Sequence, residues 1–288
     1  MTVSQNSDHG SVRRRPPWLR SLGDREPPGQ IVVGGQSYRL LDIFKHDFWA
    51  ATAIYVNDAG DRVICKFNRL QSVGWIPMAW VGRVLAAREA GFLRRLSNIE
   101  LVPRDLGSVA HEGRRLPNAV ARAFVDGEPF RVKEQVTPRF FDELKHLLAG
   151  MHAAGMAYVD LHKRENIIVG RDGRPHLIDF QVCFGLSPTW PGSGRLARYC
   201  LAKLQEMDLY HFRKHLVRCF PETLSPEQRL QFEQPPRFIR WHRKIAVPLR
   251  TLRRKLLVSL RVRDAGGQAS SELEPEAAYR EMAGKTRE

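Results

Sequence analysis

The chain has 288 residues and a formal net charge of +15, with 43% hydrophobic and 27% charged residues. These values are typical of a folded protein with a sizeable core, and they exclude a collagen-like or wholly disordered chain. The longest apolar stretch, residues 75–87, is interrupted by Gly82 and Arg83 and is too short for a transmembrane helix. The four cysteines have no C-x-x-C spacing, which argues against zinc sites and a disulfide framework, and the polar N-terminal residues show no signal peptide. We therefore expect a cytoplasmic protein.

Residues 1–29 contain Arg-Arg-Arg-Pro-Pro and Pro-Pro-Gly and predict a disordered basic arm. Residues 30–126 predict a strand-rich lobe with one helix over Met78–Leu96. The predicted strands are Ile31–Val33, Tyr38–Phe44, Phe48–Val56, Arg62–Phe67, Gly107–Glu112 and Asn118–Val125. Asp126-Gly127-Glu128-Pro129 breaks this pattern and is the candidate hinge between two lobes.

Residues 127–263 predict a mainly helical lobe, and residues 264–288 predict a disordered tail. Thr137-Pro138 has the form of an N-cap followed by proline at the first helical position. Two short strands, Ile167–Val169 and Pro175–Phe180, flank the turn at residues 171–174. A strand-rich lobe followed by a helical lobe predicts an α+β fold.

The stretch Tyr158–Val169 and the run Leu177–Gln181 carry the most informative polar residues. Asp160 and Asn166 lie in a polar turn after the predicted helix, and Asp179 ends an apolar run. The intervening hairpin can fold Asp179 back beside Asn166, which gives two oxygen ligands for a hard cation such as Mg²⁺. Asp160 would then lie close enough to orient or deprotonate an attacking hydroxyl. Asp and Asn also cap ordinary turns, but the ordered set at this spacing favours a functional site.

This ordered set resembles the catalytic loop and metal-binding motif of the protein-kinase-like superfamily. The closest likeness is to bacterial lipopolysaccharide (Kdo/heptose) kinases and RIO-like kinases. The resemblance implies a two-lobed protein-kinase-like fold that binds ATP and Mg²⁺. It implies that Asp160 is catalytic and that Asn166 and Asp179 bind the metal. Lys163, in the middle of the loop, is the candidate cation that stabilises the transferred phosphate.

Lys66 lies within the apolar strand Val63–Phe67, where it resembles the kinase lysine that holds ATP phosphates. Glu89 shares a helical stripe with apolar residues, so its carboxylate points towards the core and needs a partner. By resemblance that partner is Lys66, although an isolated lysine of this kind can also extend to water and Glu89 can lie at the border of the stripe. Asp208 resembles the helical Asp that supports the catalytic-loop backbone; the alternative is an ordinary exposed helical Asp.

Several features depart from the kinase pattern. Between the first two strands the chain has Lys45-His46-Asp47-Phe48-Trp49 and no glycine, so backbone amides cannot approach phosphates as freely. Lys45 is a candidate nucleotide-binding charge that replaces them. Asn166 follows Asp160 by six residues, where the usual pattern has five. No Ala-Pro-Glu segment follows, and only the short loop at residues 187–194 precedes the next helix.

Positive charge is concentrated in Arg237–Arg263, which carries ten Lys or Arg and no Asp or Glu. Its apolar residues recur at three- and four-residue steps around Pro248, so we expect a basic amphipathic helix that is kinked or split. Such a helix packs on the second lobe, binds an anionic membrane surface, or binds RNA or another acidic partner. No zinc finger or base-stacking motif favours nucleic acid as the partner.

Together these features predict an ATP-dependent kinase whose acceptor is a hydroxyl of a lipopolysaccharide-type, lipid-linked sugar or of a Ser or Thr side chain. Peripheral association with the inner face of the cell membrane would suit a lipid-linked acceptor. The alternative is a pseudokinase that acts as a scaffold or regulator at the membrane. The glycine-free loop favours this alternative, and retention of Lys66, Glu89, Asp160, Asn166 and Asp179 together argues against it.

Overall fold

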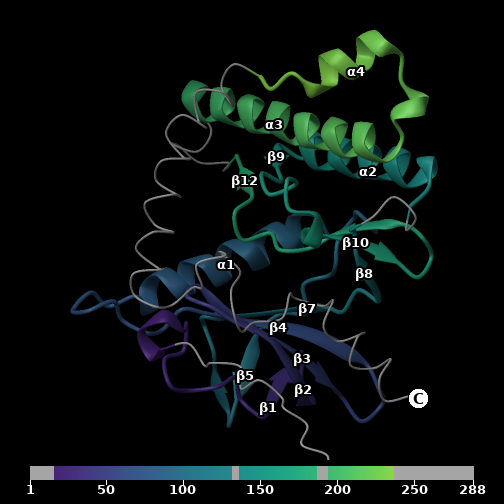
Figure 1. Cartoon of the computed structure of the whole chain (residues 1–288). Coiled ribbons are helices and arrows are strands. Elements are labelled where there is room, and N and C mark those ends of the chain that lie inside the picture. The colour runs from purple at the N-terminus through teal and green to yellow at the C-terminus, as the bar shows by residue number, and fades with distance from the viewer. Residues whose placement is uncertain (1–15, 132–135, 187–193, 237–288) are drawn as a thin grey trace, which may run out of the picture.

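A computed structural model describes residues 16–131, 136–186 and 194–236. An antiparallel sheet with one long helix forms one lobe, and the remaining helices with two small sheets form the other (Figure 1). The predicted α+β, two-lobed architecture is confirmed. The predicted Arg237–Arg263 helix, the tail at residues 264–288 and most of the loop at residues 187–194 lie outside the described residues.

The first lobe is built on a seven-stranded sheet with the order β6-β5-β1-β2-β3-β4-β7. Its strands are β1 (Gln30–Val33), β2 (Gln36–His46), β3 (Ala50–Val56), β4 (Arg62–Asn68), β5 (Val109–His111), β6 (Arg114–Arg115) and β7 (Ala119–Ala123). The turn at residues 57–61 joins β3 and β4, as its Asn-Asp-Ala-Gly sequence predicts. Lys66 pairs with Thr52 of β3 on one side and Val120 of β7 on the other, so it lies in the interior of the sheet.

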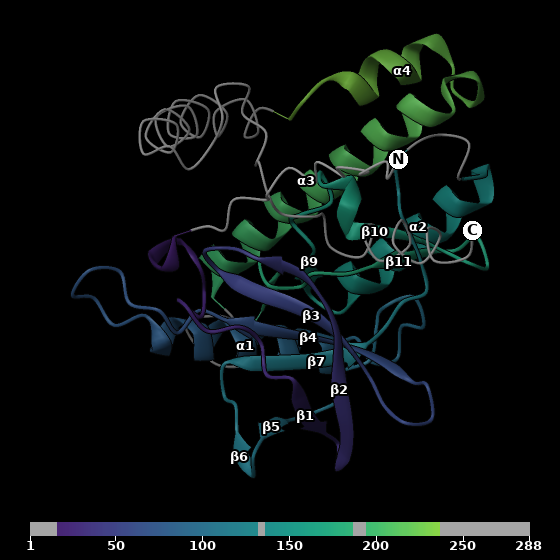
Figure 2. The ribbon, with the colours of Figure 1, turned by 60° about the horizontal axis from the view of Figure 1, so that its bottom comes forward.

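Helix α1 (Ala79–Arg95) packs across β4 and β7 (Figure 2). Its inner face buries Ala86, Glu89 and Leu93. Gly82 faces the backbone of Arg69, and a Cβ at that position would lie 2.1 Å from the Arg69 carbonyl oxygen. The glycine therefore permits the close approach between the helix and the end of β4 that brings Glu89 towards Lys66.

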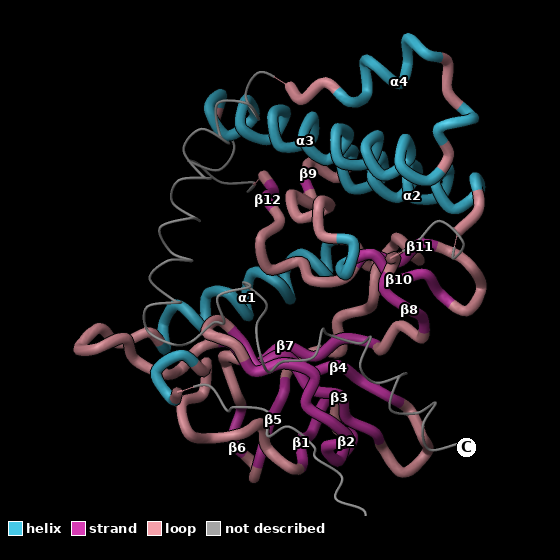
Figure 3. The backbone as a smooth tube through the Cα atoms, viewed as in Figure 1, coloured by secondary structure: helices cyan, strands magenta, loops and turns pink. Residues whose placement is uncertain are grey.

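The described residues of the second lobe form three α-helices and two small sheets (Figure 3). The helices are α2 (Pro138–Ala153), α3 (Arg195–Cys219) and α4 (Pro226–Glu233), with 3-10 turns η3 (Arg164–Asn166) and η4 (Pro221–Thr223). The strands are β8 (Gly127–Pro129), β9 (Met156–Ala157), β10 (Ile167–Gly170), β11 (Pro175–Leu177) and β12 (Phe184–Gly185). Thr137 is the N-cap of α2 and Pro138 its first residue, which confirms the predicted start of this helix.

The main core joins the two lobes. Leu93 and Leu96 from α1 and its C-terminus belong to the same buried cluster as Phe141, Leu144 and Leu148 of α2. Asp126, in the connection between the lobes, pairs with Arg62 of β4 at 3.2 Å and with Arg171 after β10 at 2.9 Å. Because apolar packing and ion pairs both cross the connection, the site between the lobes has a defined geometry.

The described part of the predicted N-terminal arm differs from the expectation. Residues 17–19 form the 3-10 turn η1, and Leu19, Arg20 and Leu22 are buried. Arg20 forms an ion pair with Glu26 in the same segment and contacts His46 Nδ1 of β2, so this segment is held against a distant strand. Composition alone could not reveal these long-range partners. None of the described helices has the length and apolar composition that a membrane span requires.

Candidate active site between the two lobes

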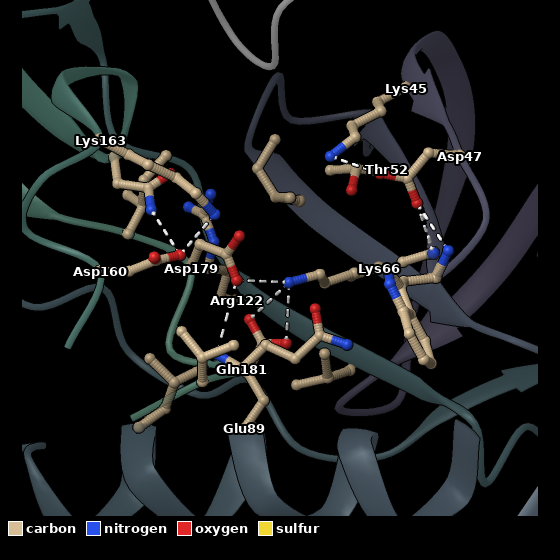
Figure 4. A pocket seen from close by; sticks show the side chains of 18 residues that line it. Lys45, Asp47, Thr52, Lys66, Glu89, Arg122, Asp160, Lys163, Asp179 and Gln181 are labelled. Atoms are coloured by element: carbon tan, nitrogen blue, oxygen red, sulfur yellow. Dashed lines mark hydrogen bonds and ion pairs between the residues drawn. The ribbon is translucent and has the colours of Figure 1, made fainter. Parts of the chain in front are cut away.

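A cavity of about 340 Å³ lies between the sheet lobe and the helical lobe (Figure 4). All seven site residues predicted from the sequence line it: Lys45, Lys66, Glu89, Asp160, Lys163, Asn166 and Asp179. The lining holds four basic side chains, Lys45, Lys66, Arg122 and Lys163, and four acidic ones, Asp47, Glu89, Asp160 and Asp179. The cavity is therefore rich in charge but balanced in sign.

Lys66 is held by carboxylates from both lobes. Its Nζ lies 2.7 Å from Asp179 Oδ1 and 3.2 Å from Glu89 Oε2. Glu89 Oε2 is buried and outside hydrogen-bond geometry, while Glu89 Oε1 accepts a long hydrogen bond of 3.5 Å from Lys66. The structure thus brings Lys66 and Glu89 together as the sequence predicts, and it places Asp179 closer to the lysine than Glu89.

The three groups influence one another's ionisation. Burial opposes the charge on Lys66, but the Asp179 and Glu89 carboxylates outweigh it and hold the pKa of Lys66 above its usual range. Burial likewise opposes ionisation of Asp179, but the Lys66 ammonium holds the pKa of that carboxyl well below its usual range. Burial raises the pKa of Glu89, and the nearby Asp179 charge adds to this effect. Lys66 and Asp179 are therefore the ionised pair, and Glu89 is the weaker partner.

The loop after β9 carries Asp160. Asp160 Oδ2 accepts a hydrogen bond of 2.6 Å from Lys163 Nζ and one of 3.5 Å from Asn166 Nδ2. His162 Nδ1 lies 3.5 Å from Asp160 Oδ1. The loop leads into the 3-10 turn η3, which ends at Asn166 and is followed directly by β10. Asp160, Lys163 and Asn166 thus form one cluster at the floor of the cavity.

Asp208 anchors this loop from α3. Its fully buried carboxylate accepts backbone hydrogen bonds of 2.7 Å from both Tyr158 and Val159, and contacts His152 Nε2 at 3.1 Å. Val159 has a φ of 72°, a left-handed conformation that a β-branched residue rarely adopts. The two hydrogen bonds stabilise that conformation and orient the following Asp160. The predicted supporting role of Asp208 is confirmed.

A second support comes from His215 of α3. Its Nε2 lies 2.8 Å from the Leu161 carbonyl oxygen, so the buried neutral imidazole donates a hydrogen bond to the loop. Burial lowers the pKa of His215 to about 4. The hydroxyl of Tyr158 donates to the Ile178 carbonyl oxygen, which ties the Asp160 loop to the segment that carries Asp179.

The turn between β2 and β3 contains no glycine and is organised around Asp47. Asp47 Oδ1 accepts hydrogen bonds from the backbone N–H groups of Trp49 at 2.8 Å and Ala50 at 2.9 Å. Asp47 Oδ2 lies 2.6 Å from Lys45 Nζ. The Asp47 carboxylate therefore accepts the hydrogen bonds of two amides of this turn and forms an ion pair with its lysine. Lys45 lines the cavity as one half of that ion pair.

Four polar residues of the cavity were not among the predicted site residues: Asp47, Thr52, Arg122 and Gln181. Arg122 lies in the middle of β7 and is 93% buried. Gln181 Nε2 donates a hydrogen bond of 3.0 Å to Asn68 Oδ1, so it connects the segment after Asp179 to the end of β4. The strict alternation of side chains along β7, with Val120 and Arg122 on one face, is the signal that could have placed Arg122 in the cavity.

The oxygen donors at the cavity floor suit magnesium. Asp179 offers a carboxylate whose side chain is 33% exposed, and Asn166, at the end of η3, offers an amide oxygen. The Ile178 N–H donates to the Asn166 carbonyl oxygen at 3.0 Å, which fixes the two segments side by side. Mg²⁺ is typically held by one or two protein oxygens together with substrate phosphates and water. No cluster of three or more His, Cys, Asp or Glu suited to an all-protein metal site occurs in residues 16–131, 136–186 and 194–236.

Comparisons with known proteins give a distant structural likeness. No protein-family model matches the chain, and no curated protein matches it in sequence. Solved structures that resemble it include the Rio2 kinase–ADP/Mg²⁺–phosphoaspartate complex from Chaetomium thermophilum, with a TM-score of 0.45 and 16% identity over 65% of this chain and 57% of that chain. A second Rio2 kinase structure from the same organism has a TM-score of 0.43 and 16% identity over 64% of this chain and 60% of that chain. The chain thus spans less than two thirds of the length of either structure.

Proposed function

We propose that this protein is a phosphotransferase that binds Mg·ATP in the cavity between the lobes and transfers the γ-phosphoryl group to a hydroxyl. The observation that carries the proposal is the convergence on one cavity of Lys66, Glu89 and Asp179 from one cluster and Asp160, Lys163 and Asn166 from another. These residues come from α1, β4, the loop after β9, the η3 turn and the segment after β11, and their roles follow from their charges and oxygen donors.

In the proposed reaction the acceptor hydroxyl oxygen attacks the γ-phosphorus, the bond from phosphorus to the bridging oxygen of ADP breaks, and Asp160 accepts the hydroxyl proton. Lys163, which already lies 2.6 Å from Asp160, supplies positive charge beside the transferred group. Lys66 binds phosphate oxygens once it is released from Asp179. Asn166 and Asp179 would hold Mg²⁺, which neutralises charge on the phosphates. Positioning and charge neutralisation supply most of the catalysis.

The acceptor we favour is a sugar hydroxyl of a lipid-linked glycan, with a Ser or Thr side chain as the other class. The resemblance of the Asp160–Asp179 motif to lipopolysaccharide kinases supports the sugar acceptor. A basic Arg237–Arg263 helix at the inner face of the cell membrane would bring the enzyme to such a substrate. Protein kinases that use a long peptide-docking platform are a poorer match, because only the short stretch of residues 187–194 precedes α3.

One observation favours the second candidate, a pseudokinase scaffold. Asp47 accepts hydrogen bonds from the Trp49 and Ala50 amides and pairs with Lys45. These are the groups of this turn that would otherwise bind ATP phosphates. A scaffold of this kind would bind its partner without turnover. The complete set of charged residues at the cavity floor supports the enzyme instead.

The experiment is a transfer assay with γ-labelled ATP and two acceptor panels, lipid-linked glycans and proteins. Wild type is compared with Asp160→Asn and with Asp142→Asn, a matched change at an exposed carboxylate of α2. We expect Asp160→Asn to retain nucleotide binding and to lower transfer by about 10²–10⁴-fold, the range typical of a lost general base. Equal transfer by Asp160→Asn and wild type would remove Asp160 from the reaction. Nucleotide binding without transfer to either panel would favour the scaffold.

A further inference from the structure

A group of exposed apolar side chains surrounds the start of α1. We call it the tryptophan surface; it comprises Trp18, Val73, Trp75, Ile76, Trp80 and Val84. Trp75 is 91% exposed and Trp80 is 62% exposed. Scattered apolar residues on a surface are ordinary, but several large ones on adjoining segments usually mark an interaction site.

The segments that carry these residues are held together by Arg69. This fully buried arginine donates hydrogen bonds to the carbonyl oxygens of Phe48 at 2.7 Å, Trp18 at 3.0 Å and Ser72 at 3.4 Å. Its guanidinium also lies 3.8 Å from the centroid of the Phe48 ring. Gly82 of α1 packs on the backbone of the same residue. The η1 turn, the loop before α1 and the first turns of α1 therefore share one rigid centre.

The loop itself presents Trp75 at its tip. Val73 and Ile76 form a two-residue bridge with reciprocal backbone hydrogen bonds of 3.0 Å, and Gly74 adopts a φ of 56° within it. Figure 1 shows the loop projecting beyond the N-terminal end of α1, and Figure 2 shows the same projection from another side. A tight turn that holds a tryptophan away from the protein body has no internal packing role for that side chain.

Positive charge accompanies the apolar residues. Trp80, Arg83, Val84 and Ala87 follow the i, i+3, i+4, i+7 spacing of one helix face, and all four are exposed. No Asp or Glu occurs between Asp61 and Glu89, and Glu89 is buried at the cavity. Of the two acidic residues near η1, Glu26 is paired with Arg20 and His46. The exposed face of α1 is consequently basic and aromatic.

We propose that the tryptophan surface docks on an anionic phospholipid bilayer, with Trp75 and Trp80 inserted at the headgroup level and Arg83 against lipid phosphates. Tryptophan favours this zone because its ring is apolar and its N–H still finds a polar partner. Arginine keeps its charge in the headgroup layer while its stem lies along apolar material. This contact is separate from the Arg237–Arg263 segment and does not depend on phosphoryl transfer.

The test is co-sedimentation of the full chain with vesicles of phosphatidylcholine and phosphatidylglycerol, beside vesicles of phosphatidylcholine alone. We compare wild type with Trp75→Ala/Trp80→Ala and with Tyr199→Ala, which removes a 62%-exposed aromatic side chain from α3 in the other lobe. We expect the double variant to bind anionic vesicles about 10- to 100-fold more weakly, since each inserted large apolar side chain contributes of the order of one tenfold step. Tyr199→Ala should bind as wild type does, and tryptophan emission should shift to the blue only with anionic vesicles.

Three results would overturn the proposal. The first is absence of vesicle binding by wild type, and the second is equal binding by the double variant and wild type. In that second case, loss of vesicle binding by Arg250→Glu/Arg254→Glu would assign the membrane contact to the Arg237–Arg263 segment alone. The third is concentration-dependent self-association of wild type that the double variant loses in the absence of vesicle binding, which would assign the surface to a second copy of the chain. Unchanged circular dichroism and thermal unfolding of the double variant serve as the folding control.

Discussion

Lys66 and Asp179 lie 113 positions apart in the chain, yet Lys66 Nζ and Asp179 Oδ1 are 2.7 Å apart across the two lobes. This distance is shorter than the 3.2 Å between Lys66 and its helix partner Glu89. The cation proposed to hold phosphates is therefore bound by the carboxylate proposed to hold the metal. Mg·ATP would satisfy both groups at once, since phosphates replace Asp179 at the lysine and the metal replaces Lys66 at the aspartate.

Replacing this lysine should weaken both nucleotide binding and the fold. Lys66→Met leaves two carboxylates at the buried site without their cation, and breaking a buried pair in this way costs about 3–5 kcal/mol. We expect the free energy of unfolding at neutral pH to fall by about that much, as measured by urea denaturation. Lys145→Met, at an exposed lysine of α2, is the matched control.

The pH dependence of this loss has a defined sign. In wild type the depressed pKa of Asp179 stabilises the fold above the unfolded pKa of an aspartate, and that stabilisation is lost as pH falls below it. In Lys66→Met the unpaired carboxylates have raised pKa values, so acid relieves their repulsion. The difference in stability between wild type and variant should therefore narrow as pH falls towards about 4. A difference that widens in acid would contradict the assignment of Lys66 as the neutralising cation.

The turn between β2 and β3 should limit nucleotide affinity. Burial opposes ionisation of Asp47, but Lys45 and the backbone N–H groups of Ala50 and Trp49 hold the pKa of its carboxyl below the usual value, so the group is charged. Asp47→Ala removes that negative charge and frees Lys45 and two amides for phosphates. We expect the Kd for Mg·ATP to fall about three- to tenfold, the effect of about one hydrogen bond. Isothermal titration is the measurement, with Asp58→Ala in the exposed turn after β3 as control; weaker binding by Asp47→Ala would show that the carboxylate itself supports the site.

The buried imidazole of His215 predicts a loss of stability in mild acid. Its pKa is about 4 in the folded protein, against an ordinary value near 6.5, so the unfolded chain binds the extra proton first as pH falls. Stability is unaffected by this group above about pH 6.5 and falls as pH decreases between the two pKa values. The loss of unfolding free energy amounts to about 2 kcal/mol by about pH 5. His215→Gln keeps a donor for the Leu161 carbonyl oxygen but cannot titrate. Its urea-unfolding free energy should vary less than that of wild type between these pH values, and an identical pH profile would contradict this account.

Local sequence patterns predicted most of the fold and of the candidate site. Alternating strands, the Asn57–Gly60 turn, and the Thr137-Pro138 start of α2 follow from nearest-neighbour chemistry, and all occur in the structure. The position of Asp160, Asn166 and Asp179 at one cavity was also predictable, because the β10–β11 hairpin returns the segment of Asp179 to that of Asn166. Asp208 was predictable only through its resemblance to a family position.

Other features depend on partners that sequence spacing does not reveal. Arg20 is buried because Glu26 compensates its charge and His46 lies against its guanidinium, whereas a Pro- and Arg-rich composition predicts an arm. Arg69 is buried because carbonyl oxygens from three separate segments surround its guanidinium. In the sequence, Asp47 is distinguished only as part of a glycine-free loop. The backbone hydrogen bonds that its carboxylate accepts depend on the conformation of the turn. These are long-range or conformational effects, and periodicity carries no signal for them.

Thermal unfolding with and without Mg·ATP tests the central claim most directly. Wild type is measured beside Asp179→Ala and beside Asp172→Ala, a half-exposed carboxylate in the turn between β10 and β11. Ligand at about 100 times its Kd adds about 2.7 kcal/mol to the stability of a protein that binds it only when folded. The account predicts a Mg²⁺-dependent rise in Tm of several degrees for wild type and Asp172→Ala, and no such rise for Asp179→Ala relative to its own baseline. No rise in wild type, or the same rise in Asp179→Ala, would contradict nucleotide binding at this cavity.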